Sequence, residues 1–80
     1  MKLVKQAESF KERLIHLSDH GLLKYHECIK IDNKLDFTIN QFKYLPDTQE
    51  NQEVILILLM CKIEIQMALT WLEQQDLNSA

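Results

Sequence analysis

The residues that build tight turns are nearly missing from this sequence. Its 80 residues contain one glycine, Gly21, and one proline, Pro46. Because hairpins and sheet turns draw heavily on these residues, their scarcity argues against a fold rich in β-structure. The two also divide the chain into three segments of helical length. We therefore expect an all-α protein with helices at about 3–20, 23–45 and 48–76.

Cysteine is equally scarce, with only Cys28 and Cys61 present. Each lies within an apolar helical pattern and the two form no spaced framework, which favours reduced thiols inside a cell. The N-terminus turns polar before an apolar signal segment can form, so no leader peptide is expected. These features predict one cytoplasmic domain over residues 1–80. A domain this small buries only about 60% of its unfolded surface, so a partner would add needed stability.

Positive charge is too sparse and scattered for a nucleic-acid-binding protein. Nine Lys and Arg residues stand against twelve Asp and Glu, a net charge of −3 at pH 7. No basic stripe with interleaved aromatic residues is present, so we expect no nucleic-acid partner. Residues 1–46 hold eight basic and six acidic residues, whereas residues 47–80 hold one and six. This asymmetry would help the third helix dock onto the first two.

The first two segments each carry one apolar seam with steps of three and four residues. Gly21 follows the first seam, where a left-handed C-terminal cap is needed. Pro46 ends the second segment, and Asp47 with Glu50 three residues later has the pattern of a capping box for the third helix. The seams are Leu3, Ala7, Phe10, Leu14 and Leu17, then Cys28, Ile31, Leu35, Thr38, Phe42 and Leu45.

The third segment is apolar on more sides than two short helices can cover. One seam runs through Val54, Leu58, Cys61, Ile65, Ala68 and Leu72. Among the apolar residues on its other sides, we expect six to bind a partner: Leu56, Leu59, Met60, Ile63, Met67 and Trp71. In a soluble protein such a surplus face marks an interface. The pattern predicts a three-helix up-down bundle, a helical hairpin plus a long apolar third helix, completed by oligomerisation or a partner. A homodimer, a complex with another protein and a monomer that folds the face away all remain open.

The same segment must also be considered as a membrane helix. Its unbroken apolar run is eight residues long, from Val54 to Cys61, and the polar residues Lys62, Glu64 and Gln66 interrupt the pattern after Cys61. Because a membrane span needs about twenty predominantly apolar residues, we expect no membrane insertion.

Two polar groups are candidates for chemistry. His16 and His20 lie four residues apart, and Cys28 could join them as a third zinc ligand. The spacing matches no known metal motif, and surface histidines near a helix C-terminus explain the pair more simply, so no metal or other cofactor is expected. Asp32 and Asp36, also four apart, could position a water or a metal-bound phosphate, or form an ordinary solvated face.

In the second segment, residues 32–36 read Asp-Asn-Lys-Leu-Asp, residues 38–42 read Thr-Ile-Asn-Gln-Phe, and His26-Glu27 precedes both stretches. With these residues, the chain from Phe10 to Leu45 resembles the small two-helix aspartyl-phosphate phosphatases that act on sporulation response regulators. The second helix of that family carries a Ser-Gln-Glu-Leu-Asp motif and then a Leu-Ile-Asn-x-Tyr-like stretch, and the family often has a His-Pro-Glu turn where His26-Glu27 stands here. The resemblance implies that Asp36 is presented to the phospho-aspartate of a response regulator.

In outline, the small size and the surplus apolar helix face are similar to small bacterial secretion-system co-chaperones. That similarity implies an amphipathic face laid against a helix of a partner protein. No glycine-rich phosphate loop and no assembled nucleophilic triad indicate an enzyme. We therefore predict a non-enzymatic regulator or co-chaperone that packs an apolar helix face against a partner or its own copy. The aspartyl-phosphate phosphatase is the alternative.

Overall fold

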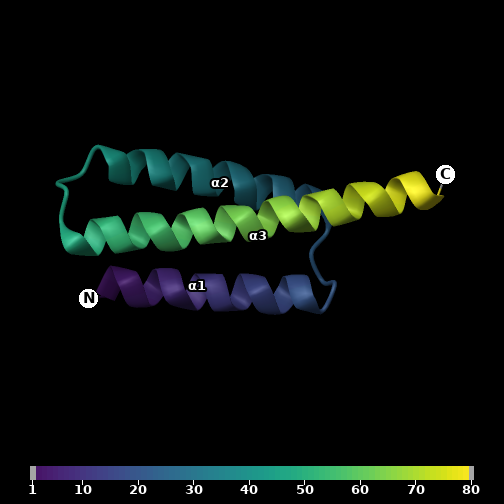
Figure 1. The fold of residues 1–80 in the computed structure, drawn as a ribbon, viewed down its shortest axis with the longest axis horizontal. Coiled ribbons are helices and arrows are strands. Elements are labelled where there is room, and N and C mark those ends of the chain that lie inside the picture. Colours follow the sequence, from purple (N-terminus) through teal and green to yellow (C-terminus); the bar gives the residue numbers. More distant parts are fainter. Residues whose placement is uncertain (1, 80) are drawn as a thin grey trace.

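Three helices make up nearly all of the described chain. The computed structural model describes residues 2–79, with side chains described for residues 2–75. The helices are α1 (Lys2–Asp19), α2 (Tyr25–Lys43) and α3 (Gln49–Ser79), and they run up, down and up (Figure 1). The predicted all-α three-helix bundle is confirmed. Helix α2 begins two residues later and ends two residues earlier than predicted, whereas α3 ends three residues later.

The long helix α3 is the central element of the bundle. Both α1 and α2 pack along α3, whereas no Cα atom of α1 lies within 8 Å of a Cα atom of α2 among the described residues. The Cα atoms extend over 48 × 21 × 14 Å, so the bundle is elongated and thin. The two shorter helices are therefore held together chiefly through α3, which crosses in front of the gap between them (Figure 1).

Gly21 makes the turn that follows α1. Its backbone has a φ of +64°, the left-handed region that only glycine adopts without steric cost. The N–H of Gly21 donates to the carbonyl of Ser18 at 3.1 Å, and the N–H of Leu22 donates to the carbonyl of Leu17 at 2.9 Å. This pairing is a Schellman motif, and it confirms the predicted C-terminal cap.

The residue that caps the start of α3 is Thr48, not Asp47. The Thr48 hydroxyl accepts a hydrogen bond from the backbone N–H of Asn51 at 3.1 Å, which is N-cap geometry. Asp47 accepts instead from the side-chain amide of Gln52 at 2.7 Å. The predicted capping box at Asp47 was wrong because α3 begins at Gln49, which puts Thr48 in the position directly before the helix.

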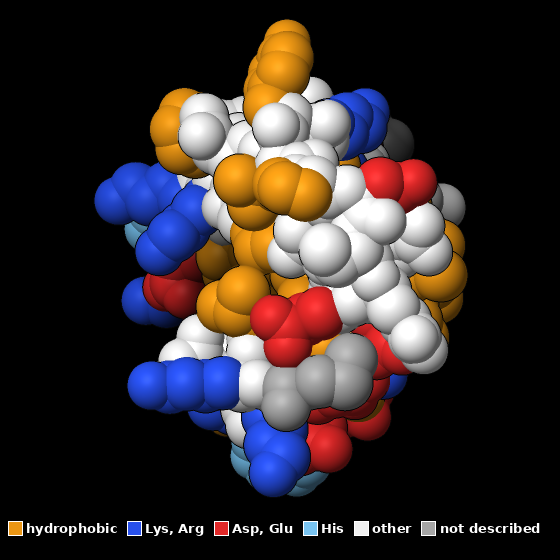
Figure 2. All heavy atoms as spheres, turned by 90° about the vertical axis from the view of Figure 1, so that its left-hand side faces the viewer, with side chains coloured by type: hydrophobic (Ala, Val, Ile, Leu, Met, Phe, Trp, Pro, Cys, Tyr) orange, Lys and Arg blue, Asp and Glu red, His pale blue; other side chains and the backbone are white. Residues whose placement is uncertain are grey.

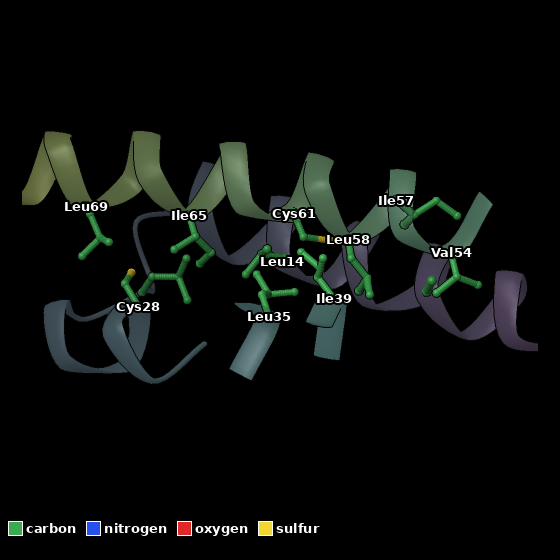
Figure 3. Packing of buried hydrophobic residues seen from close by; sticks show 12 residues of the cluster. Leu14, Cys28, Leu35, Ile39, Val54, Ile57, Leu58, Cys61, Ile65 and Leu69 are labelled. Atoms are coloured by element: carbon green, nitrogen blue, oxygen red, sulfur yellow. The ribbon is translucent and has the colours of Figure 1, made fainter. Parts of the chain in front are cut away.

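One hydrophobic core forms where α1 and α2 meet the inner side of α3 (Figure 3). Its buried residues are Ala7, Leu14, Leu23, Cys28, Leu35, Ile39, Val54, Ile57, Leu58, Cys61, Ile65 and Leu69. Four members of the predicted α3 seam are in this list, and the other two, Ala68 and Leu72, pack against it. The inner seam of α3 is therefore confirmed.

The seams of the two shorter helices differ from the prediction mainly at their ends. Leu3 and Leu45 are exposed. Leu45 lies beyond the end of α2 at Lys43, so it no longer follows the helical repeat. Ile39 is buried although it was not assigned to the seam, because it lies four residues after Leu35 and therefore on nearly the same face of α2.

Candidate protein-binding surface

The outer side of α3 carries a continuous strip of exposed apolar side chains. Its members are the six predicted partner-binding residues Leu56, Leu59, Met60, Ile63, Met67 and Trp71, and we call this set the outer stripe. Their exposed fractions run from 46% for Leu59 to 62% for Ile63 and Met67. The structure thus brings all six residues onto one open face, while their role in binding stays a prediction.

The outer stripe exists because α3 carries apolar residues on two opposite sides. Ile63 and Ile65 are two residues apart, which is about 200° around a helix. Ile65 is fully buried in the core, and Ile63 points to the opposite side. Since α1 and α2 both occupy the inner side of α3, the opposite side keeps its apolar surface open.

Met67 and Trp71 form the ridge of this surface. One shallow hollow runs along α3 beside Leu59 and Gln66, and a second lies between α3 and the end of α1 near Asp19. Both Met67 and Trp71 line both hollows. Trp is a frequent anchor in protein interfaces and Met adapts its shape, so the ridge with a hollow on each side suits a protein partner.

Acidic side chains border the outer stripe. Glu53 and Glu64 lie seven residues before Met60 and Trp71 respectively, so they share one flank of α3 with these two members of the stripe. On the other flank, beyond Lys62, lies Asp36 of α2. We call Glu53, Glu64 and Asp36 the acidic rim. Most of the Lys and Arg side chains visible in Figure 2 gather on the side of the molecule away from α3.

Lys62 joins α3 to α2 at the edge of the outer stripe. Its Nζ atom lies 3.1 Å from Oδ1 of Asp32 and 2.5 Å from Oδ1 of Asp36. The side-chain amide of Gln66 also donates to Oδ1 of Asp32, at 3.1 Å. The hydrogen bond to Asp36, together with the bond and the charge of Asp32, raises the pKa of Lys62 above its usual 10.5 despite partial desolvation. The positive charge of Lys62 is therefore matched by two carboxylates within the fold.

The candidate catalytic pair, Asp32 and Asp36, is bonded to this lysine. The Asp32 side chain is only 17% exposed, whereas that of Asp36 is 54% exposed. Both carboxylates link two helices, which is a structural role. Sequence reasoning missed Lys62 as their partner because it lies 26 residues after Asp36, and no local pattern joins positions that far apart.

The structure does not bring the three candidate zinc ligands together. The rings of His16 and His20 lie with their centroids 4.2 Å apart, and Nδ1 of His20 is 2.9 Å from the carbonyl oxygen of His16. Cys28 is fully buried in the core, where burial raises the pKa of its thiol. Among the residues that the structure describes, no three His, Cys, Asp or Glu side chains are grouped to hold a metal ion.

Residues Gln49–Gln75 of α3 are long and apolar enough to cross a membrane by length and composition. This is weak support for a membrane span, because the central helix of a soluble bundle meets the same criteria. A third of the most apolar window is buried against the other helices, and Lys62 near its middle forms ion pairs with α2. The outer stripe accounts for much of the remaining apolar surface.

No protein-family model matches this chain, and none of the curated proteins or solved structures compared with it matches either. The likenesses to phosphatases and co-chaperones stay predictions, and function must be argued from the surface itself.

Proposed function

We propose that this protein is a non-enzymatic binding protein that packs the outer stripe of α3 against another protein or a second copy of itself. Such a protein acts by occupying a partner's surface, as a cytoplasmic regulator or co-chaperone does. The observation that carries the proposal is the outer stripe, six large apolar side chains exposed together on one helix face. Contiguous apolar surface of this kind marks interaction sites in soluble proteins.

The size of the surface bears on how much of the cost of binding it can offset. Burying one large apolar side chain fully is worth about 1.5–3 kcal/mol, so covering six half-exposed ones contributes on the order of 5–9 kcal/mol. Association itself costs about 4–15 kcal/mol in lost freedom of motion. The stripe can therefore offset the lower part of that cost, and polar contacts at its edges would add to it.

The phosphatase alternative has less support from the geometry. Its functional carboxylate, Asp36, would have to meet a phospho-aspartate while bonded to Lys62. Asp32 is held by both Lys62 and Gln66. These contacts explain the two carboxylates without catalysis.

A photo-crosslinking amino acid placed in the stripe tests the proposal in cells that naturally express the protein. We expect the probe at Met67 to give a discrete covalent adduct, whose second component is identified by mass spectrometry as one particular protein or a second copy. The matched control is the same probe at Phe37, which is 66% exposed on α2, outside the stripe. The absence of an adduct at position 67, or the same mixture of adducts at both positions, would contradict the proposal.

A further inference from the structure

We infer that the outer stripe receives an amphipathic helix of another protein, whose apolar seam is flanked by lysine or arginine residues. This inference rests on the proposed function and adds the chemistry of the partner. Two observations carry it, the shape of the stripe and the charge of its border.

The shape of the outer stripe fits a helix. It runs from Leu56 to Trp71 along a single helix, over roughly 22 Å at 1.5 Å per residue. Its apolar positions recur at three and four residues, the spacing that a second helix presents when it packs lengthwise. The ridge of Met67 and Trp71 has a hollow on each side, in which side chains of that helix can lie.

The acidic rim at the border of the stripe favours a partner helix with positively charged flanking residues. Glu53 and Glu64 line one flank, and Asp36 lies beyond the other. The basic residue of α3, Lys62, is paired with Asp32 and Asp36, so the three side chains on this flank together keep one formal negative charge. Complementary charge at an interface favours the right partner and speeds its association.

A second copy of this chain is a poorer match for the same surface. Two copies that meet through their outer stripes also bring two acidic rims together. Most of the basic side chains visible in Figure 2 lie on the side away from α3, and Lys62, at the edge of the stripe, is already paired with Asp32 and Asp36. A membrane with anionic headgroups is disfavoured by the same negative border.

The test uses the purified full-length chain and three synthetic helical peptides that share a leucine seam and differ only in flanking residues: lysine, glutamine or glutamate. Trp71, the chain's one tryptophan, is 54% exposed, so its fluorescence reports docking through a blue shift. We expect the lysine-flanked peptide to bind at least about 10-fold more tightly than the glutamine-flanked one. This preference should shrink between about 0.05 and 0.5 M salt, because exposed charges are screened.

Matched variants connect the binding to the surface. Ile63→Asp should abolish binding of the lysine-flanked peptide, whereas Phe37→Asp on α2 should leave it unchanged. Replacing the rim residues Glu53 and Glu64 by glutamine should reduce the preference for lysine flanks, because only Asp36 of the rim remains, while leaving the affinity for the glutamine-flanked peptide unchanged.

Several results would overturn the inference. Equal binding of all three peptides would refute the charge preference but leave the proposed function standing. If no peptide binds, the helical partner is wrong, and crosslinking at Met67 decides the proposed function separately. A dimer in sedimentation that Ile63→Asp dissociates would assign the stripe to a second copy, and a Trp71 blue shift with phosphatidylcholine vesicles would assign it to lipid.

Discussion

The ammonium group of Lys62 and the carboxylate of Asp32 lie 3.1 Å apart and join the middle of α3 to α2. Their side chains are 22% and 17% exposed, so the pair is better shielded than an ordinary surface ion pair. Asp36 adds a second, more exposed contact to the same lysine. Lys62 is the only basic residue in residues 47–80, and it stabilises the packing of two helices beside the outer stripe.

Removing the charge of Lys62 should destabilise the bundle. Lys62→Met keeps most of the apolar stem and deletes both ion pairs, leaving two carboxylates without their cation. We expect the free energy of unfolding in urea to fall by about 1 kcal/mol, near the upper end for partly exposed pairs. Lys30→Met, at an exposed lysine of α2, is the control and should change it by less than about 0.5 kcal/mol. Equal effects of both variants would show that the ion pairs contribute nothing.

The contribution of Lys62 should disappear at high pH. Its pKa is raised in the folded state above the usual 10.5, so the folded protein holds this proton more tightly than the unfolded chain does. The stabilisation is therefore complete below pH 10.5 and is lost as the pH rises through the folded-state pKa. The difference in unfolding free energy between wild type and Lys62→Met should stay constant from neutral pH to about 10 and then shrink. If this difference in unfolding free energy grew as the pH rises above 10, folding would lower the pKa of Lys62, contrary to the prediction.

Two isoleucines on α3 should respond very differently to the same substitution. Ile65→Val removes a methylene group from a fully buried side chain and should lower the free energy of unfolding by about 0.5–1.5 kcal/mol. Ile63→Val removes the same group from a 62% exposed side chain and should change it by less than about 0.5 kcal/mol. Urea unfolding of both variants provides the measurement. Similar losses would place Ile63 in a buried environment, as in a tight dimer.

The N-terminal cap of α3 gives a second matched pair. Thr48→Ala removes the hydroxyl that accepts from the N–H of Asn51, and we expect it to cost about 1 kcal/mol. Asp47→Ala removes a side chain that accepts from the exposed amide of Gln52 and should cost less. Thermal unfolding followed by circular dichroism distinguishes the two, and the reverse order would restore Asp47 as the cap.

Both thiols should be protected in the folded protein. Cys28 and Cys61 are fully buried, and burial raises the pKa of each, which lowers the fraction of reactive thiolate. Labelling with a disulfide reagent should be slow in buffer and rapid in concentrated urea, with two thiols reacting per chain. Ser9→Cys, at an exposed position of α1, should add one thiol that reacts at once without urea. Rapid labelling of the native cysteines would show that the core opens readily.

Local sequence patterns predicted the three helices, the Gly21 cap and the inner seam of α3 because each depends on residues within a few positions of one another. Local patterns failed in two situations. In one, either of two neighbouring residues could cap a helix, and in the other, the contact joins residues far apart in the sequence. Asp47 and Thr48 are both good cap residues, and a shift of one residue in the helix start selects Thr48. The link from Lys62 to Asp32 joins positions thirty residues apart, and only the packing of α2 on α3 brings them together.

The sequence by itself determined that α3 is apolar on two opposite sides, since Ile63 and Ile65 lie about 200° apart around the helix. Its spacing also favoured the side of Val54, Leu58 and Cys61 for the core, but local spacing could not say whether α1 and α2 would both lie on that side. The tertiary structure decided this point. Both α1 and α2 pack against the side that holds Val54, Leu58, Cys61 and Ile65, and their backbones stay apart. Two short helices on the same side of a third cannot reach around it, so the outer stripe stays open.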